Sequence, residues 1–238
     1  NIIQNLPNIK SKKIQEKRSV FLAYDYDLEV KKSKKNNDST KSKNKIKKPG
    51  KVNGYPLVIR DLYSSEEDTI HFVTNYVFAK KSKTLAYTTT GLKDKNKPGV
   101  YVLDLKTNEK KLVFESHKKT KYFKLKLSDS GKSLGFIVDS DSTKVQRRPY
   151  ELYSWNFKDN MAKLLINEQN SPKGFKVSSN GSITFSKDDS RLYFGLATPQ
   201  IIQDTLLLDE EIVNVEVWTY DEPRLYTVQE KQVKNDKN

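Results

Sequence analysis

The sequence predicts an all-β fold built from a repeated antiparallel unit. Three observations carry this prediction: a strand–turn–strand pattern recurs along the 238 residues, a second strand motif follows each copy, and helix-like patterns are missing between the copies. Parallel α/β folds need helical patterns of about 10–15 residues between their strands, and only Pro199–Glu211 offers a helix, a short one. A sheet of this kind cannot bury both of its faces alone, so the units have to stack.

The first half of the repeat is a pair of strands joined by a polar turn. It occurs three times, at Tyr76–Tyr87, Lys126–Phe136 and Thr184–Phe194. A leucine follows each turn, and these leucines, Leu85, Leu134 and Leu192, lie 49 and 58 residues apart. Such intervals fit the four-stranded blades of a β-propeller with loops of variable length. We therefore expect the three leucines to be buried at equivalent positions in successive sheets.

A further strand motif follows each of the three hairpins, and an earlier copy of it precedes the first hairpin. Its copies are Leu57–Leu62, Val100–Leu105, Leu152–Phe157 and Val215–Tyr220. Trp155 and Trp218 take equivalent positions in it, which favours packing between blades over ligand stacking. Together the motifs predict about four blades of four antiparallel strands within one propeller domain. The expected blade ranges are 1–67, 68–119, 120–170 and 171–238, the last of which includes the start of the next blade.

The net charge of +14 is concentrated in one segment. Lys31–Lys48 holds nine lysines and one aspartate, a surplus of eight positive charges. This lysine-rich loop, residues 31–50, falls between the middle strands of the first blade and offers almost no apolar side chain for a core, so we expect it to be solvated and poorly ordered. A patch that binds polyanions is the alternative. Nucleic acid is not favoured as a partner, because only six of the 44 basic residues are arginine, the residue preferred for bidentate contacts.

Composition excludes several kinds of site. The chain has no cysteine, so disulfides, thiolate nucleophiles and cysteine-ligated zinc are ruled out. Its two histidines, His71 and His117, are too few for a histidine-rich metal site. No apolar run approaches the roughly 18 residues needed to span a bilayer. We therefore predict no catalytic residue, no cofactor, no metal ligand and no membrane span.

One string imitates a catalytic motif. Gly131–Gly135 matches the G-x-S-x-G pattern of a nucleophile elbow, with Ser133 at its centre. An elbow needs a strand before the serine and a helix after it, whereas this serine lies between a hairpin turn and a strand. We interpret Ser133 as a turn residue.

Three segments resemble a known family. Gly54–Leu62, Ser128–Leu134 and especially Val215–Gln229 are similar to the propeller domain of the prolyl oligopeptidase (S9) family of serine peptidases. The resemblance runs from about Ser19 to the end of the chain. It implies that the chain is the non-catalytic part of a seven- or eight-bladed propeller, which caps a carboxy-terminal α/β-hydrolase domain and gates the access of oligopeptides.

The same resemblance implies partners and a location. The partners would be the hydrolase domain of the parent chain and an oligopeptide substrate, and a periplasmic or secreted location is favoured. The catalytic serine, aspartate and histidine of the family belong to the hydrolase domain, and this sequence holds no counterpart of them. The alternative is a free-standing propeller of the TolB or WD40 type that binds a protein or peptide.

Two pairs of charged residues are candidates for contact with a substrate. Glu210 and Glu211 could bind the amino group of a peptide, because carboxylates favour an ammonium ion. Arg147 and Arg148 lie in the loop between the middle strands of the third blade and could meet carboxylates of a ligand. For both pairs, a solvated turn or loop end is the simpler interpretation.

The lysine-rich loop yields the first testable prediction. Deleting most of Lys31–Lys48 should leave the melting temperature within a few degrees, because the segment has no side chains with which to build a core. Thermal denaturation of the full chain and of the deletion variant measures this change. A large loss of stability would mean that the lysines make tertiary contacts, and loss of salt-sensitive polyanion binding would favour the polyanion-binding alternative.

Overall fold

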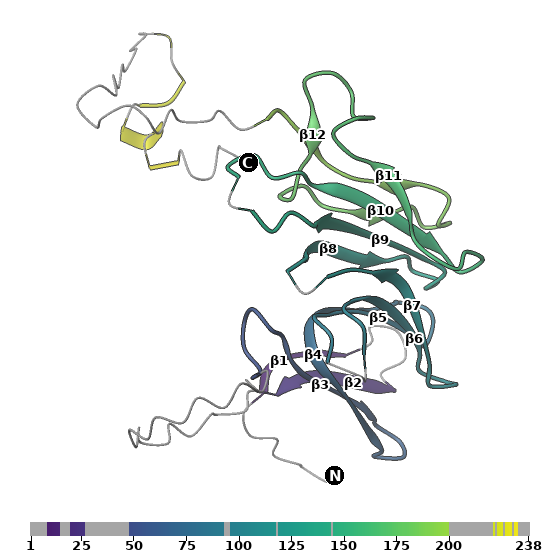
Figure 1. The fold of residues 1–238 in the computed structure, drawn as a ribbon. Helices are drawn as coiled ribbons and strands as arrows, with labels where there is room; N and C mark the ends of the chain where they lie inside the picture. Colours follow the sequence, from purple (N-terminus) through teal and green to yellow (C-terminus); the bar gives the residue numbers. More distant parts are fainter. Residues whose placement is uncertain are drawn as a thin grey trace, which may run out of the picture.

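The computed structural model consists almost entirely of antiparallel strands (Figure 1). It describes residues 9–14, 20–26, 48–92, 96–117, 119–143, 145–199, 221, 223–225, 227–229 and 231–232. Residues 227–229 and 231–232 are helical. The strands, in chain order, are β1 (Ile9–Ile14), β2 (Phe21–Tyr26), β3 (Tyr55–Asp61), β4 (Glu67–Phe78), β5 (Thr84–Thr89), β6 (Gly99–Asp104), β7 (Glu109–Glu115), β8 (Lys121–Leu127), β9 (Ser133–Asp139), β10 (Glu151–Asn156), β11 (Lys163–Ile166), β12 (Lys176–Val177), β13 (Thr184–Phe185), β14 (Leu192–Tyr193) and β15 (Leu196–Ala197).

The first two repeat units share strand β4. Its first half pairs with β3 and its second half with β5, and Val73 pairs with residues of both. The chain bends at Phe72, whose φ of 59° is unusual for a bulky residue. Gly54 lies against this bend, and a Cβ there would come within 2.5 Å of the Phe72 carbonyl carbon. The first unit is therefore β1–β2–β3 with the outer half of β4, and the second is the inner half of β4 with β5–β6–β7.

The third unit is a separate four-stranded sheet in the order β8–β9–β10–β11. After it, β12 pairs with β15 and β13 with β14, which makes one interrupted hairpin. Gly181 and Gly195 face each other across it, and a Cβ on Gly181 would lie 2.7 Å from the Gly195 Cα. Only glycine permits two backbones to approach this closely.

The turns that open the three repeated hairpins are closed in the same way. A backbone N–H donates to the carbonyl oxygen five residues further on: Ala79 to Thr84 at 2.9 Å, Ser128 to Ser133 at 2.8 Å, and Ser186 to Arg191 at 2.9 Å. Leu85, Leu134 and Leu192 each follow the accepting residue directly. The alignment predicted from the three leucines is thus confirmed by backbone hydrogen bonding.

Three apolar cores lie between successive units. Leu85 belongs to the core between the first and second units, and Leu134 to the core between the second and third. Leu192 packs against the core between the third unit and the following hairpin. Leu85 and Leu134 are fully buried as expected, whereas Leu192 is only half-buried. Trp155 lies in the second core at 4% exposure, which confirms its role in packing between blades.

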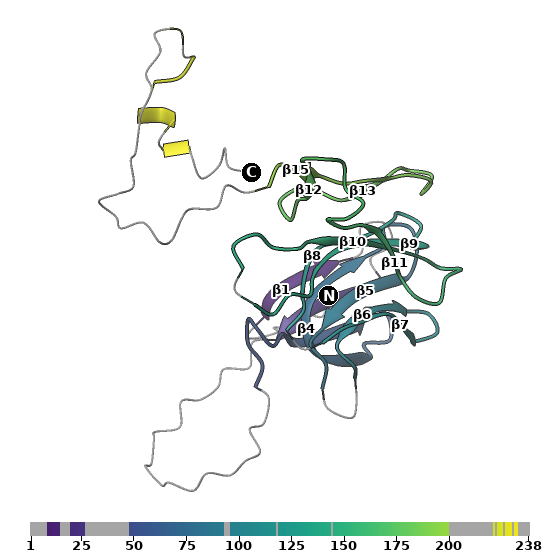
Figure 2. The ribbon, with the colours of Figure 1, turned by 45° about the horizontal axis from the view of Figure 1, so that its top comes forward.

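The units are arranged side by side about their inner strands. Contacts between units join β1 with β4, β4 with β8, and β5 with β8, and Figure 1 shows the sheets stacked from β1–β4 at the bottom of the view to β8–β11 above. Figure 2 shows the β12, β13 and β15 strands lying over the β8–β11 sheet. Antiparallel sheets stacked in this way around their first strands confirm the prediction of an all-β propeller fold. The total number of blades stays a prediction.

Several sequence-based expectations fall outside the described residues. Residues 27–47 include most of the lysine-rich loop, and residues 200–220 include the last strand motif with Trp218. The expected boundary between the first two blades, at 67–68, coincides with the start of β4, whereas the change of partner lies at Phe72–Val73. The extent of the fourth blade over 171–238 stays a prediction.

The leucine positions predict a graded response to truncation. Leu134→Ala should lower the free energy of unfolding by about 2–5 kcal/mol, because it empties a fully buried site. Leu192→Ala should cost less, since part of that side chain already faces solvent. Leu164→Ala, at a residue that is 41% exposed, serves as the control and should change stability by about 0.5 kcal/mol or less. Urea denaturation measures all three, and equal losses would contradict the assignment of the cores.

Candidate functional site

One end of the sheets carries the longer connections. Because consecutive strands alternate in direction, the β2–β3, β5–β6 and β9–β10 loops and the connections between units all leave at this end, which we call the loop face. Two hydrogen bonds tie neighbouring connections together. The Nε2–H of His117 donates to the Ser140 carbonyl oxygen at 2.8 Å, and the Thr90 hydroxyl donates to the Asn53 carbonyl oxygen. The opposite end, the turn face, carries the short turns that open each hairpin.

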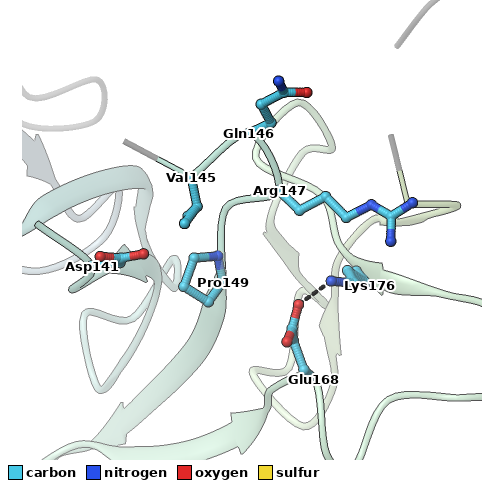
Figure 3. Close-up of a pocket in the computed structure, with 7 residues that line it drawn as sticks. All are labelled: Asp141, Val145, Gln146, Arg147, Pro149, Glu168 and Lys176. Atoms are coloured by element: carbon cyan, nitrogen blue, oxygen red, sulfur yellow. Dashed lines mark hydrogen bonds and ion pairs between the residues drawn. The ribbon is translucent and has the colours of Figure 1, made fainter. Parts of the chain in front are cut away.

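The loop face has an open hollow of about 570 Å³ beside the third unit (Figure 3). The β9–β10 loop and the connection from β11 to β12 form its walls. Its lining residues are Asp141, Val145, Gln146, Arg147, Pro149, Glu168 and Lys176.

Arg148 fixes the shape of the β9–β10 loop. Its Nε and Nη2 donate to the two carboxylate oxygens of Asp139, each at 2.8 Å, and the Asp139 side chain is only 2% exposed. Its Nη1 and Nη2 also donate to the carbonyl oxygens of Thr143 at 2.7 Å and Asp141 at 2.5 Å. The hydrogen bonds to the Asp139 carboxylate, followed by the negative charges of Asp139 and Asp141, raise the pKa of Arg148. A bidentate guanidinium–carboxylate pair of this kind is strong and strongly directional.

A second turn within the loop is held by Asp141. Its carboxylate accepts hydrogen bonds from the Thr143 backbone N–H at 2.7 Å and from the Thr143 hydroxyl at 2.8 Å. These bonds, the backbone one first, lower the pKa of Asp141 below its ordinary value of 3.8. The ionised carboxylate therefore stabilises the folded loop fully above about pH 4, and this contribution is lost as the pH falls through the lowered pKa.

Charge and apolar surface alternate around the hollow. Figure 3 shows Arg147 with Glu168 and Lys176 on one side, and Asp141, Val145 and Pro149 on the other. Lys176 and Glu168 form an ion pair across the wall. Val145 is 47% exposed. Such a wall combines the guanidinium of Arg147 and the Lys176–Glu168 ion pair with a valine and a proline.

The two predicted arginines therefore have different surroundings. Arg147 lines the hollow, whereas Arg148 is bound to Asp139 in support of the loop. Glu210 and Glu211 lie outside the described residues. Glu168 and Lys176, which sequence reasoning missed, come from separate elements, and no local motif marks them.

Ser133 is built into the sheet. It is the first residue of β9 and is 6% exposed. Its hydroxyl oxygen accepts a hydrogen bond from the Asn156 Nδ2 at 3.1 Å, and its backbone N–H donates to the Ser128 hydroxyl at 3.2 Å. A nucleophilic serine needs an exposed hydroxyl with a base beside it. The turn before Ser133 and the strand after it confirm the prediction that it belongs to a hairpin.

Two further searches cover the described residues only. Among them, no three histidine, aspartate or glutamate side chains are grouped as a metal site requires. Within the same residues, no helix is long and apolar enough to cross a membrane.

Comparison with known proteins finds propellers among solved structures. The sequence matches no family model and no curated protein. Similar structures include TolB from Acinetobacter baumannii (18% identity, TM-score 0.39, 78% of this chain and 37% of that one). A second is the acylaminoacyl peptidase of Pyrococcus horikoshii (12% identity, TM-score 0.43, 72% of this chain and 26% of that one). A third is the propeller domain of the Trilobed protease from Pyrococcus furiosus (12% identity, TM-score 0.32, 71% of this chain and 59% of that one). The chain thus spans only part of the length of these three proteins: 37%, 26% and 59%, respectively.

The clamp at Arg148 predicts opposite outcomes for the two arginines. Arg148→Gln should lower the melting temperature by several degrees, because it leaves the buried Asp139 carboxylate without its cation. Adding Asp139→Asn should restore part of the loss, since both charges are then removed. Arg147→Gln is the matched control and should have little effect. Melting curves followed by circular dichroism decide the matter, and equal effects at both arginines would contradict the clamp.

Proposed function

We propose that this chain is the non-catalytic part of a propeller that receives peptides at its loop face and gates their access to a serine peptidase domain of the prolyl oligopeptidase type. The observation that carries the proposal is the clamped β9–β10 loop. It presents Arg147, Val145 and Pro149 to a hollow while Arg148 and Asp139 hold it in place.

A clamped loop is suited to binding because the conformational entropy of ordering the loop is already lost when the protein folds. Two hydrogen bonds from the Arg148 guanidinium hold the backbone carbonyl oxygens of Asp141 and Thr143, and two more anchor it to the Asp139 carboxylate, so the loop beside the hollow is fixed. A ligand that docks there gains contacts without first having to order the loop. A volume of about 570 Å³ lies within the range of about 300–1,000 Å³ typical of small-ligand pockets, enough for a few residues of a peptide.

The peptidase part of the proposal is supported by the sequence. Gly54–Leu62, Ser128–Leu134 and Val215–Gln229 resemble the propeller of that family. The chemistry is assigned to a separate hydrolase domain, because Ser133 is buried in a sheet and bonded to Asn156. In this account the propeller selects peptides by size and shape, and the parent's location is the periplasm or the exterior.

A serine-reactive fluorophosphonate probe tests this proposal. This chain alone should stay unlabelled and should not cleave proline-containing or acyl-amino chromogenic peptides, because the serine of its G-x-S-x-G string, Ser133, is buried and is followed by a strand in place of the helix of a nucleophile elbow. The product of the complete gene should be labelled at a serine beyond Asn238. Ser133→Ala is the control and should leave that labelling unchanged.

Two outcomes would overturn the proposal. Labelling of this chain at Ser133, lost in Ser133→Ala, would make the chain itself catalytic. A complete gene product that reacts with no serine probe and contains no hydrolase domain would leave a free-standing propeller that binds a protein or peptide.

A further inference from the structure

The innermost strands of the described units carry one sign of charge. Lysines occur three times in β1, three times in β8 and once in β12, while the inner half of β4, residues 73–78, is uncharged. None of these inner segments contains an aspartate or glutamate. The lysines are Lys10, Lys12, Lys13, Lys121, Lys124, Lys126 and Lys176.

The outer strands show a different balance. The outer half of β4 begins with Glu67 and Asp68, and β7 has Glu109 and Glu115 beside its two lysines. Lysines near the outside are also paired: Lys110 with Asp68 at 2.8 Å and Lys97 with Glu115 at 2.9 Å. By contrast, Lys12, Lys121, Lys124 and Lys126 have no ion-pair partner among the residues that the structure describes. Of the other inner lysines, Lys176 is paired with Glu168, and Lys10 and Lys13 interact with the Asp25 carboxylate of β2. The positive charge without an ion pair at the inner edge thus comes from four lysines of β1 and β8.

Local features orient two of these lysines, Lys124 and Lys13. The pairing of β8 with β9 shifts register between Phe123 and Lys126, and Lys124 in this bulge has a φ of 51°. Bulges commonly re-aim a side chain, and a lysine seldom adopts a left-handed backbone. Lys13 reaches from β1 across to the inner strand of the next unit, where its Nζ donates to the Tyr76 carbonyl oxygen at 2.6 Å.

We propose that β1, β8 and β12 form a lysine-lined inner wall that binds acidic segments of a peptide. That the ligand is a peptide rests on the proposed function; that the peptide is acidic is the new inference. Lys176 belongs both to this wall and to the hollow, so a peptide held at the loop face meets the ammonium groups next. The wall attracts carboxylates because its four lysines without an ion-pair partner among the described residues outnumber the nearby carboxylates, Asp25 and Glu168, which face other lysines of the wall.

The inner strands do not suit a nucleic acid. Binding of single strands relies on exposed aromatic rings on which bases stack. Tyr76 is 3% exposed, and the Tyr122 hydroxyl is bonded to that of Ser116. The inner wall also has lysines only and no arginine, which leaves it without the bidentate donors used in base recognition. Lysines on edge strands can also serve only to prevent edge-to-edge pairing, and the experiment separates these accounts.

The test compares two sets of lysines in the full chain. The nine lysines of residues 31–48 are first replaced by glutamine, so that the loop cannot supply the binding. The inner set is then Lys12→Gln, Lys121→Gln and Lys124→Gln. The matched control set is Lys106→Gln, Lys158→Gln and Lys187→Gln, which removes the same charge from exposed positions on the turn face. Fluorescence anisotropy follows binding of labelled hexaglutamate, hexaglutamine and a single-stranded oligothymidine.

Hexaglutamate should bind the parent and the control set equally. It should bind the inner set about tenfold more weakly, as expected for the loss of three exposed ion pairs. Affinity should fall as salt rises from about 50 mM to about 300 mM. Replacing the inner lysines by arginine should preserve binding, and unchanged melting temperatures should show that every variant folds.

The other outcomes overturn the inference in distinguishable ways. Equal losses in the two sets, or no binding of hexaglutamate, would leave the inner lysines as edge protection. Tighter binding of oligothymidine, lost in the inner set, would assign the wall to nucleic acid. Hexaglutamine bound as well as hexaglutamate would keep the peptide-binding function and refute the charge preference. If neither hexaglutamate nor hexaglutamine bound to the protein, this inference would be refuted. Labelling of the complete gene product by the fluorophosphonate probe would still support the peptidase assignment in that case.

Discussion

The rest of the structure depends on one constraint: both faces of every sheet must be covered by a neighbour. Side chains alternate across a strand, and β5 shows the result. Leu85 and Tyr87 enter the core toward the first unit, while Ala86 enters the core toward the third. In β9, Phe136 and Ile137 divide between two cores in the same way. No unit has a core of its own, so the cores exist only between units.

The spacing between sheets follows from side-chain size at these shared faces. At Gly135, an added Cβ would lie 3.2 Å from both Ile183 and Leu192 of the following hairpin. The third unit therefore presents a flat face there, and the next hairpin packs close to it. On the turn face, the Lys81 N–H donates to the Asp129 carbonyl oxygen at 2.8 Å, and Ser130 bonds to the Asp189 carboxylate. Polar contacts between successive turns thus fix the register that the apolar cores leave free.

The fold could be predicted from the sequence because it rests on short-range patterns. The three leucines follow turns of similar composition, and each of those turns closes with the same hydrogen bond. That one continuous strand, β4, belongs to both the first and the second unit could not be predicted, because the sequence pattern of its two halves is that of two separate strands. The bend at Phe72 and the close approach of Gly54 reveal it only in three dimensions.

The candidate site was predicted less well than the fold. The sequence placed Arg147 and Arg148 in one loop but gave no reason to distinguish them. What distinguishes the two arginines is the burial of Asp139, the last residue of β9. In the sequence this aspartate looks like an ordinary turn residue. Its nearly complete burial requires a cation, and Arg148 is the one that reaches it. Glu168 and Lys176 meet only because the third unit and the following hairpin stack.

The undivided passage through β4 has a consequence for the order in which the molecule opens. The first and second units are joined by continuous main-chain hydrogen bonding, since Val73 pairs with both β3 and β5. The third unit shares no strand with them. It is joined to the second by side-chain packing and by isolated main-chain hydrogen bonds, from the Lys81 N–H to the Asp129 carbonyl oxygen and from the Ala162 N–H to the Val113 carbonyl oxygen. Regions of a protein open in cooperative blocks set by such boundaries. We therefore expect the first two units to open as a single block and to exchange their amide hydrogens together, whereas the third unit, which shares no strand with them, can open separately.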